Sequence, residues 1–157
     1  KYSSLVLKYN VENQGAEPRP RFSSSAVRTV AFHPKKPILA SGSDDGTIIL
    51  WSVNEGNMRP VWSMGPPVRN NHVSSLAFHS TGLFLAGGCR DMLYLWKMED
   101  DRGELNIKML EKVTPHPGGL VSGVAFHPTS FIIATCSPNR SSKLWCFKDK
   151  LTIQYII

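Results

Sequence analysis

An internal repeat is the feature that most constrains how this chain folds. Residues 27–34 (VRTVAFHP) return as residues 73–80 (VSSLAFHS) and again as residues 121–128 (VSGVAFHP). The phenylalanines of successive copies are 46 and then 48 residues apart. A chain that repeats at such a period forms similar units that bury their apolar faces against one another.

Each copy is followed by three further segments with the pattern of a strand. Two apolar runs, the second ending at a tryptophan, are separated by a polar turn, and a segment of alternating apolar and polar residues comes last. The first runs are residues 38–40, 83–86 and 131–134; the second are 48–51, 93–96 and 144–145; the last are 60–64, 105–110 and 151–157. Each repeat therefore predicts four short antiparallel strands. No amphipathic helix of useful length is present, so we expect an all-β fold.

The stretch SGSDDGTIILW at residues 41–51 closely matches the most recognisable part of the WD-repeat family, which the chain resembles over residues 4–157. This resemblance implies a β-propeller in which each repeat is one four-stranded blade. Residues 4–11 align with the tryptophan-bearing strands, with Tyr9 at the tryptophan position. They predict a strand of a preceding blade. A propeller closes from about four to eight blades, so we expect a partial propeller whose remaining blades lie outside these residues.

Domain boundaries follow from the repeat. Residues 1–25 are the remnant of a preceding blade and a linker, residues 26–64 are the first full blade, residues 65–110 are the second and residues 111–157 are the third. We expect all of them to be parts of one propeller domain.

The resemblance also implies a hydrogen-bonded set of His, Ser or Thr, Asp and Trp inside each blade. The residues that fit are Asp45, Trp51 and either Ser41 or Ser43 in the first blade, Asp91 and Trp96 in the second, and His116, Trp145 and either Thr135 or Ser137 in the third. The first blade lacks the His, Asn139 replaces the Asp of the third, and His72 lies too close to Phe78 to be assigned. Incomplete sets indicate blades that depend more on apolar packing.

A Phe-His pair recurs at the same place in all three repeats. The pairs are Phe32 and His33, Phe78 and His79, and Phe126 and His127. A residue that recurs in every unit meets a need of every unit, whereas an active site gathers its groups once from different places. We therefore expect these histidines to shape the turn after the innermost strand, and we predict no catalytic residue.

Two other clusters suggest chemistry but do not support it. Asp44, Asp45, Asp100 and Asp101 lie in polar turn sequences, where solvated carboxylates are expected, and Asp45 is expected to bind backbone NH groups of its turn. Cys136 and Cys146, with His116 and His127, match no compact zinc spacing. We expect the two cysteines to be small buried residues on separate strands. No metal and no cofactor is predicted, and the chain is not expected to be an enzyme.

Charge and composition bear on the partner and the compartment. The net charge of +6 favours an acidic partner, such as nucleic acid, an anionic membrane or an acidic protein tail. The alternative is a generally solvated basic surface, because the eighteen Lys and Arg residues are scattered along the chain. Arg28, Arg69, Arg90 and Arg140 fall near strand ends at the rim of one predicted face, so we infer a partner-binding group, with solubility as the alternative. An odd count of three cysteines does not indicate a disulfide framework. The sequence contains no run of about eighteen apolar residues, so no membrane span is predicted. We expect an intracellular protein, cytoplasmic rather than nuclear.

The resemblance implies a non-catalytic scaffold for protein–protein interactions within a larger complex. The third blade is similar to blades of the regulatory subunit of katanin, a microtubule-severing complex, and the first is similar to striatin, a phosphatase scaffold. The likeness to katanin points to a cytoskeletal or microtubule-associated role, whereas the likeness to striatin points to a phosphatase complex. The alternative is a propeller that uses its basic surface to associate with nucleic acid or a ribonucleoprotein.

Overall fold

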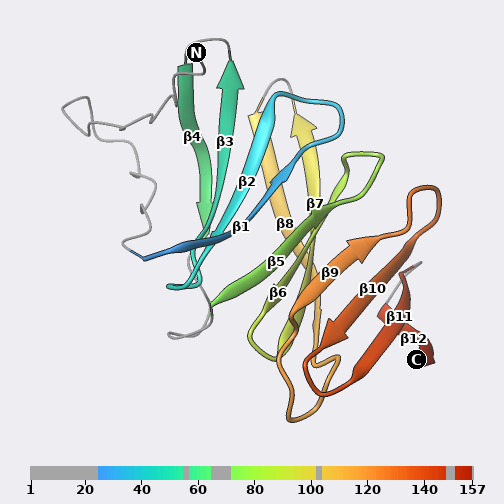
Figure 1. Ribbon diagram of the computed structural model, residues 1–157. Helices are drawn as coiled ribbons and strands as arrows, with labels where there is room; N and C mark the ends of the chain where they lie inside the picture. The colour runs from blue at the N-terminus through green and yellow to red at the C-terminus, as the bar shows by residue number, and fades with distance from the viewer. Residues whose placement is uncertain (1–24, 55–56, 65–71, 102–103, 148–150, 157) are drawn as a thin grey trace, which may run out of the picture.

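The computed structural model describes residues 25–54, 57–64, 72–101, 104–147 and 151–156, and these residues form three four-stranded antiparallel sheets (Figure 1). The first sheet contains β1 (Val27–Phe32), β2 (Ile38–Ser43), β3 (Ile48–Asn54) and β4 (Asn57–Met64); the second contains β5 (Val73–Phe78), β6 (Phe84–Cys89), β7 (Met92–Asp101) and β8 (Glu104–Val113); the third contains β9 (Gly123–Phe126), β10 (Ile132–Ser137), β11 (Ser141–Phe147) and β12 (Leu151–Ile156). The all-β prediction is confirmed, and each repeat forms one blade.

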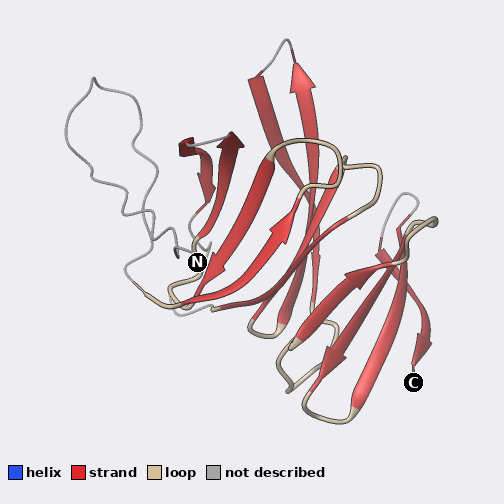
Figure 2. Ribbon diagram, turned by 45° about the horizontal axis from the view of Figure 1, so that its top comes forward, coloured by secondary structure: helices blue, strands red, loops and turns tan. Residues whose placement is uncertain are grey.

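Within each blade the strands lie in chain order, each paired with the next. Figure 2 shows the three sheets side by side in an arc, as expected for part of a propeller. Strand β8 continues to Val113, three residues past the end expected for the second blade. The strand predicted at residues 4–11, and Arg69, lie outside the described residues. No helix in the described part of the chain is able to cross a membrane.

Strand β7 is buried on both of its faces because a blade stands on each side of it. Tyr94 and Trp96 belong to the apolar cluster shared with the first blade, whereas Leu93 and Leu95 belong to the cluster shared with the third. Alternate side chains of a strand point to opposite faces, so residues 92–96 of β7, which lie between the two neighbouring blades, are all apolar. The two apolar clusters of the core therefore lie at the joints between blades. Each fully buried side chain of this size contributes roughly 1.5–3 kcal/mol to the free energy of unfolding.

Close approach of neighbouring blades requires a very small residue at one position of the second strand. A Cβ atom on Gly42 would lie 2.5 Å from Val73 Cγ1, and one on Gly88 would lie 2.7 Å from Val121 Cγ1. Cys136 holds this place in the third blade and is exposed, because no described blade covers it. The prediction that Cys136 is buried is therefore wrong, and Cys146, on the neighbouring strand, is only half-buried.

Each outer strand carries a β-bulge opposite the tryptophan. Register shifts occur between Leu50 and Trp51, between Leu95 and Trp96, and between Leu144 and Trp145. The extra residue on the outer strand is Val61 in the first blade and Leu110 in the second. A bulge bends the strand and interrupts its alternation, which explains why these segments have the weakest pattern in the sequence.

The recurring histidine joins one blade to the next. His33 Nδ1 accepts hydrogen bonds from the backbone NH groups of Lys35 and Lys36, at 3.1 and 3.0 Å. The proton is therefore on Nε2, which donates to the carbonyl of Gly82 in the second blade at 2.9 Å. The histidine thus shapes its own turn, as the sequence predicts, and also forms a bond across the joint.

The other two histidines show what this joint requires. His79 stacks on Phe131 of the third blade, with ring centroids 5.0 Å apart, and its buried Nε2 has no hydrogen-bond partner among the described residues. His127 is exposed, since no described blade follows it. At the opposite end of the arc, Phe32 is 70% exposed. Its counterpart Phe78 instead packs edge-on against His33.

The contact between His33 and Gly82 supports a first prediction. Gly82 has a φ of +78°, and a Cβ atom there would lie 2.4 Å from His33 Cε1. Gly118 has a similar φ of +73° but open space around its Cβ position. We expect Gly118→Ala to lower the free energy of unfolding by about 1 kcal/mol from the left-handed backbone alone. Gly82→Ala should lower it by about 2 kcal/mol more, because the His33 ring must move.

Urea unfolding of the two variants measures this difference directly. Equal losses of stability in Gly82→Ala and Gly118→Ala would show that the joint tolerates displacement of the histidine.

Candidate interaction surfaces

The third blade contains a buried hydrogen-bonded set that connects its inner and outer parts. Trp145 Nε1 donates to Thr135 Oγ1 at 3.0 Å, and His116 Nε2 lies 3.1 Å from the same hydroxyl. The other ring nitrogen of His116 lies 2.7 Å from Ser141 Oγ. Of the two candidates, Thr135 and not Ser137 supplies the hydroxyl that binds Trp145. This arrangement positions the loop that holds His116 against the blade.

The first two blades hold less complete versions of this set. Trp51 Nε1 donates to Ser41 Oγ at 2.8 Å, which selects Ser41 over Ser43. Asp45 Oδ1 accepts from the backbone NH of Thr47 at 2.9 Å, as predicted.

In the second blade Gly87 stands where the other two blades have a hydroxyl, and the buried Trp96 Nε1 has no hydrogen-bond partner among the described residues. Trp96 packs face to face on Tyr94 instead. Asp91 lies half-buried in the turn between β6 and β7.

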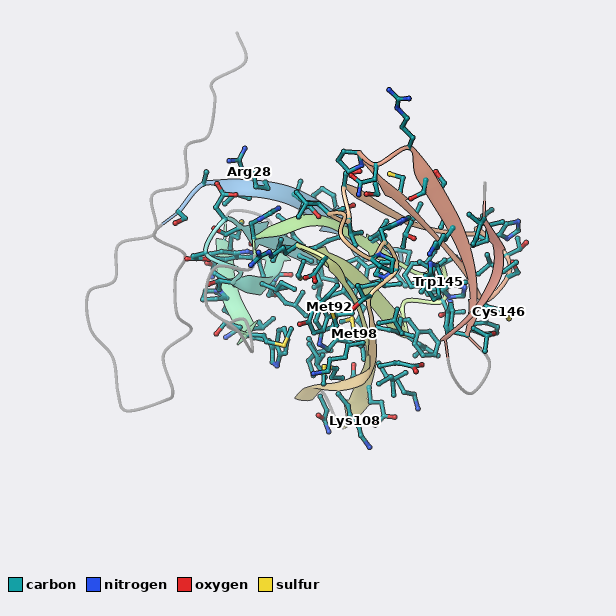
Figure 3. The ribbon with its side chains drawn as sticks, turned by 90° about the horizontal axis from the view of Figure 1, so that it is seen from below. Arg28, Met92, Met98, Lys108, Trp145 and Cys146 are labelled. Atoms are coloured by element: carbon teal, nitrogen blue, oxygen red, sulfur yellow. The ribbon has the colours of Figure 1, made fainter. Side chains whose placement is uncertain are left out.

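The turns between the second and third strands of the three blades lie on one side of the arc, which we call the turn face. They are residues 44–47, 90–91 and 138–140. Arg28 lies beside this edge, and Figure 3 shows it at the margin of the arc, on β1. Its guanidinium binds both carboxylate oxygens of Asp44 at 2.7 Å and holds the pKa of Asp44 below its usual range. Arg28 is therefore engaged within its own blade and is not a free anchor, and Asp44 is not simply a solvated turn residue.

Arg90 and Arg140 differ from Arg28 in backbone and environment. Both are exposed, with φ values of 54° and 61°, and neither forms an ion pair within the described residues. The Arg90 carbonyl accepts from the Val121 backbone NH at 2.6 Å, which ties this turn to the third blade. Arg140 holds the place that Gly46, with a φ of 81°, occupies in the first blade.

Arginine at these positions has an energetic cost. A residue with a side chain in the left-handed region is less stable by roughly 1–3 kcal/mol, and glycine relieves this strain. Glycine is present in the first blade, so the fold itself does not require arginine at the turn. The strain therefore points to a use of the two exposed guanidinium groups on the turn face.

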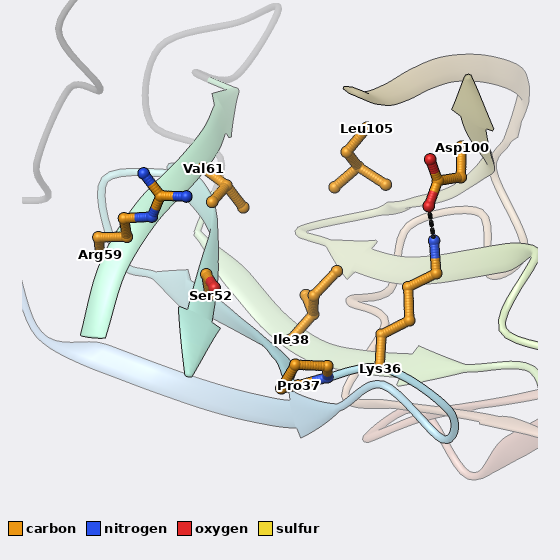
Figure 4. A pocket seen from close by; sticks show the side chains of 8 residues that line it. All are labelled: Lys36, Pro37, Ile38, Ser52, Arg59, Val61, Asp100 and Leu105. Atoms are coloured by element: carbon orange, nitrogen blue, oxygen red, sulfur yellow. Dashed lines mark hydrogen bonds and ion pairs between the residues drawn. The ribbon is translucent and has the colours of Figure 1, made fainter. Parts of the chain in front are cut away.

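A cavity of about 520 Å³ lies at the outer part of the joint between the first and second blades (Figure 4). It is lined by Lys36, Pro37, Ile38, Ser52, Arg59, Val61, Asp100 and Leu105. Lys36 Nζ binds Asp100 Oδ2 at 2.5 Å across the joint. The expectation that Asp100 is only a solvated turn residue is therefore wrong: it lies on β7, where chain folding brings it to the loop between β1 and β2.

The repeat pattern in the sequence does not predict this cavity, because the cavity is formed by residues that differ from one repeat to the next. No motif joins Lys36, Arg59 and Asp100, which come from a loop, an outer strand and the end of a long hairpin. The one signal available is that Ile38 stands where the second blade has Phe84.

The shared hydroxyl of the third blade generates a second prediction. Thr135→Val keeps the shape of the side chain but leaves the Trp145 indole NH and a ring nitrogen of His116 buried without a partner. We expect the free energy of unfolding to fall by about 2–4 kcal/mol, because each unsatisfied buried group costs about 1–3 kcal/mol. Thr114→Val is the matched control at an exposed site and should change stability by less than about 0.5 kcal/mol. Comparable losses in the two variants would contradict the role given to the hydroxyl.

Stability should also depend on pH through two histidines. The pKa values of His33 and His116 are lowered, mainly because both side chains are buried. A pKa below the unfolded value of about 6.5 means that the unfolded chain binds more protons. The stability from these groups is thus complete above about pH 6.5 and is lost as the pH falls through their folded-state pKa values. In addition, a protonated Nδ1 on His33 would face two NH donors.

We expect the urea midpoint to fall between about pH 7.5 and about pH 5.5, a range above that in which carboxylates titrate. His33→Leu should reduce this fall, because it removes one of the two histidines whose pKa is lowered by burial. A wild-type midpoint that is the same at both pH values would refute the prediction.

Comparison with known proteins gives a consistent picture. The model of the WD domain, G-beta repeat, matches residues 18–52, 65–97 and 107–146. The chain is similar to nuclear distribution protein PAC1 of Komagataella phaffii, at 32% identity over 76% of this chain and 25% of that protein. It is also similar to pre-mRNA-processing factor 19 of Mus musculus, at 30% identity over 81% of this chain and 24% of that protein. The chain spans about a quarter of the length of these two relatives.

Two further similarities support the propeller fold and the expected likeness to striatin. The crystal structure of the RRP9 WD40 repeats superposes with a TM-score of 0.73 at 26% identity, over 87% of this chain and 40% of that one. Striatin-4 of Homo sapiens is 26% identical over 76% of this chain and 17% of its own length. The likeness of one blade to the katanin regulatory subunit stays a prediction. Because the family model matches more than half of its residues and its blades superpose on those of a WD40 propeller, this chain belongs to the WD-repeat family and forms three blades of a β-propeller.

Proposed function

We propose that this chain is part of a non-catalytic scaffold that binds an acidic segment of a partner protein on the turn face, within a larger intracellular complex. The observation that carries this proposal is the pair of strained and exposed arginines, Arg90 and Arg140, neither of which has an ion-pair partner in the described part of the chain. Arginine binds carboxylates through two parallel hydrogen bonds, and it is frequent among the residues that dominate interface energies.

The scaffold beneath these arginines supports the proposal. The hydrogen bond from the Val121 backbone NH to the Arg90 carbonyl fixes the backbone of the second turn on the third blade, so the Arg90 side chain starts from a fixed backbone. Preorganised groups lose less entropy on binding than groups on free loops. Further blades that close the propeller would cover the exposed side of β1, where Val30 and Phe32 have no covering strand in the described part of the chain.

A second candidate is association with RNA. The net charge of +6 and the relative named for pre-mRNA processing favour it, whereas the relative named for nuclear distribution favours the cytoskeletal role expected from the sequence. The two candidates differ in their physics. Binding to phosphates weakens steeply with salt and is spread over many cations, whereas a protein partner depends on a few anchors.

The test uses the full chain with two probes: a glutamate-rich peptide of the tubulin tail type and a single-stranded RNA of equal charge. We expect the double variant Arg90→Glu/Arg140→Glu to weaken peptide binding at least tenfold. The control Lys108→Glu/Lys112→Glu has the same net charge, and both side chains are exposed on β8. Figure 3 shows Lys108 far from Arg28 in the arc. The control should bind within twofold of wild type.

Fluorescence anisotropy at about 50 and about 200 mM salt measures these affinities. Equal losses in both double variants would show a non-specific charge effect and refute the proposed face. Tighter binding of the RNA than of the peptide, with the steeper salt dependence, would replace the protein partner by the nucleic-acid candidate.

A further inference from the structure

The two described joints between blades are not filled in the same way. Phe84 begins β6 and packs edge-on against Phe131 and Phe147 of the third blade, with ring centroids 6.0 and 5.3 Å away. At the same position of the first blade, β2 begins with Ile38. The smaller side chain leaves the outer part of the first joint unfilled, and the cavity of about 520 Å³ lies there.

Apolar side chains from three strands surround this cavity. Ile38 comes from β2, Val61 from β4 and Leu105 from β8, and Figure 4 shows them around the same space. Val61 is the bulge residue of its strand and has no partner on β3, and 40% of its surface is exposed. The bulge thus presents an aliphatic side chain to solvent at the mouth of the cavity.

The charged groups lie at the two ends of the cavity and are not equivalent. At one end Lys36 is neutralised by Asp100 at 2.5 Å. At the other end Arg59 is exposed and forms no ion pair within the described residues. Figure 4 shows Arg59 on β4, on the side of the cavity away from the ion pair. The lining therefore carries one uncompensated positive charge beside an apolar floor.

We propose that this cavity binds a short peptide segment of a partner protein that inserts an aliphatic side chain among Ile38, Val61 and Leu105 and places an adjacent carboxylate on Arg59. The volume lies within the range of about 300–1,000 Å³ typical of binding pockets. Pro60 and the bulge interrupt the backbone donors on the edge of β4, so recognition relies on side chains and not on the addition of another strand. This site is distinct from the turn face and does not depend on it.

A library of random octapeptides displayed on phage and selected on the full chain tests the proposal. We expect the selected peptides to carry Asp or Glu within one or two residues of Leu, Ile or Val. Arg59→Glu and Ile38→Phe should each weaken binding of these peptides at least tenfold, by charge reversal and by filling the cavity. Phe is the residue that the second blade has at the position of Ile38, so the repeat itself accommodates it. Val61→Tyr, a larger and uncharged side chain at an exposed site, gives the same steric test if Ile38→Phe lowers the thermal midpoint.

Lys108→Glu is the matched control, because Lys108 holds the same position in the second blade as Arg59 in the first. Lys108 of β8 pairs with Lys97 of β7, and Arg59 of β4 pairs with Ser52 of β3. It should bind within twofold of wild type, as should Arg90→Glu, which keeps the outcome separate from that of the turn face. Selection without an acidic and aliphatic pair, or equal binding by all variants, would overturn the proposal. So would a loss in Arg59→Glu alone, which would mean that charge acts without the cavity. Self-association of the chain that both cavity variants abolish would assign the cavity to a second copy.

Discussion

The packing of one blade against the next is the constraint on which the rest of this structure depends. A single four-stranded blade has two apolar faces and cannot bury either of them alone. The second blade shows the result, because alternate residues of β7 contribute to two separate clusters, one on each side. Three features of the repeat serve this contact: the glycines that permit close approach, the histidine that reaches the next blade and the apolar runs that fill the joint.

The joint also explains where the repeat is allowed to vary. Leu76 NH donates to Thr29 Oγ1 and Val124 NH donates to Ser75 Oγ, both at 3.1 Å, so a hydroxyl on one inner strand binds the backbone of the next. The third blade has Gly123 at this place. The hydroxyl partner of the tryptophan is lost in the second blade, where Trp96 packs on Tyr94. The unsatisfied indole NH of Trp96 costs about 1–3 kcal/mol, and burial of a large apolar side chain contributes roughly 1.5–3 kcal/mol, so apolar packing offsets the missing hydrogen bond.

Departures from the repeat carry the functional hypotheses. Arg90 and Arg140 hold left-handed backbone where glycine would be less strained, and Ile38 stands where phenylalanine fills the equivalent joint. Neither departure improves the packing of the blade. The two surfaces differ in chemistry as well: the turn face offers exposed arginines, and the cavity offers apolar side chains beside Arg59, which forms no ion pair with any described residue. The two proposals together would place two partner segments on the same arc of blades.

The sequence by itself determined the class of fold, the number of described blades and the strands within them. Period, alternation and the positions of tryptophan are local properties, and they survive because every blade must form the same ladder. It also predicted the turn role of Asp45 and of the histidines. Only the tertiary structure decided what crosses a joint. The bond from His33 to Gly82, the pairing of Arg28 with Asp44, the ion pair of Lys36 with Asp100 and the exposure of Cys136 all depend on which segments meet in space. These contacts join residues far apart in the chain, and no local pattern specifies how neighbouring blades fit together.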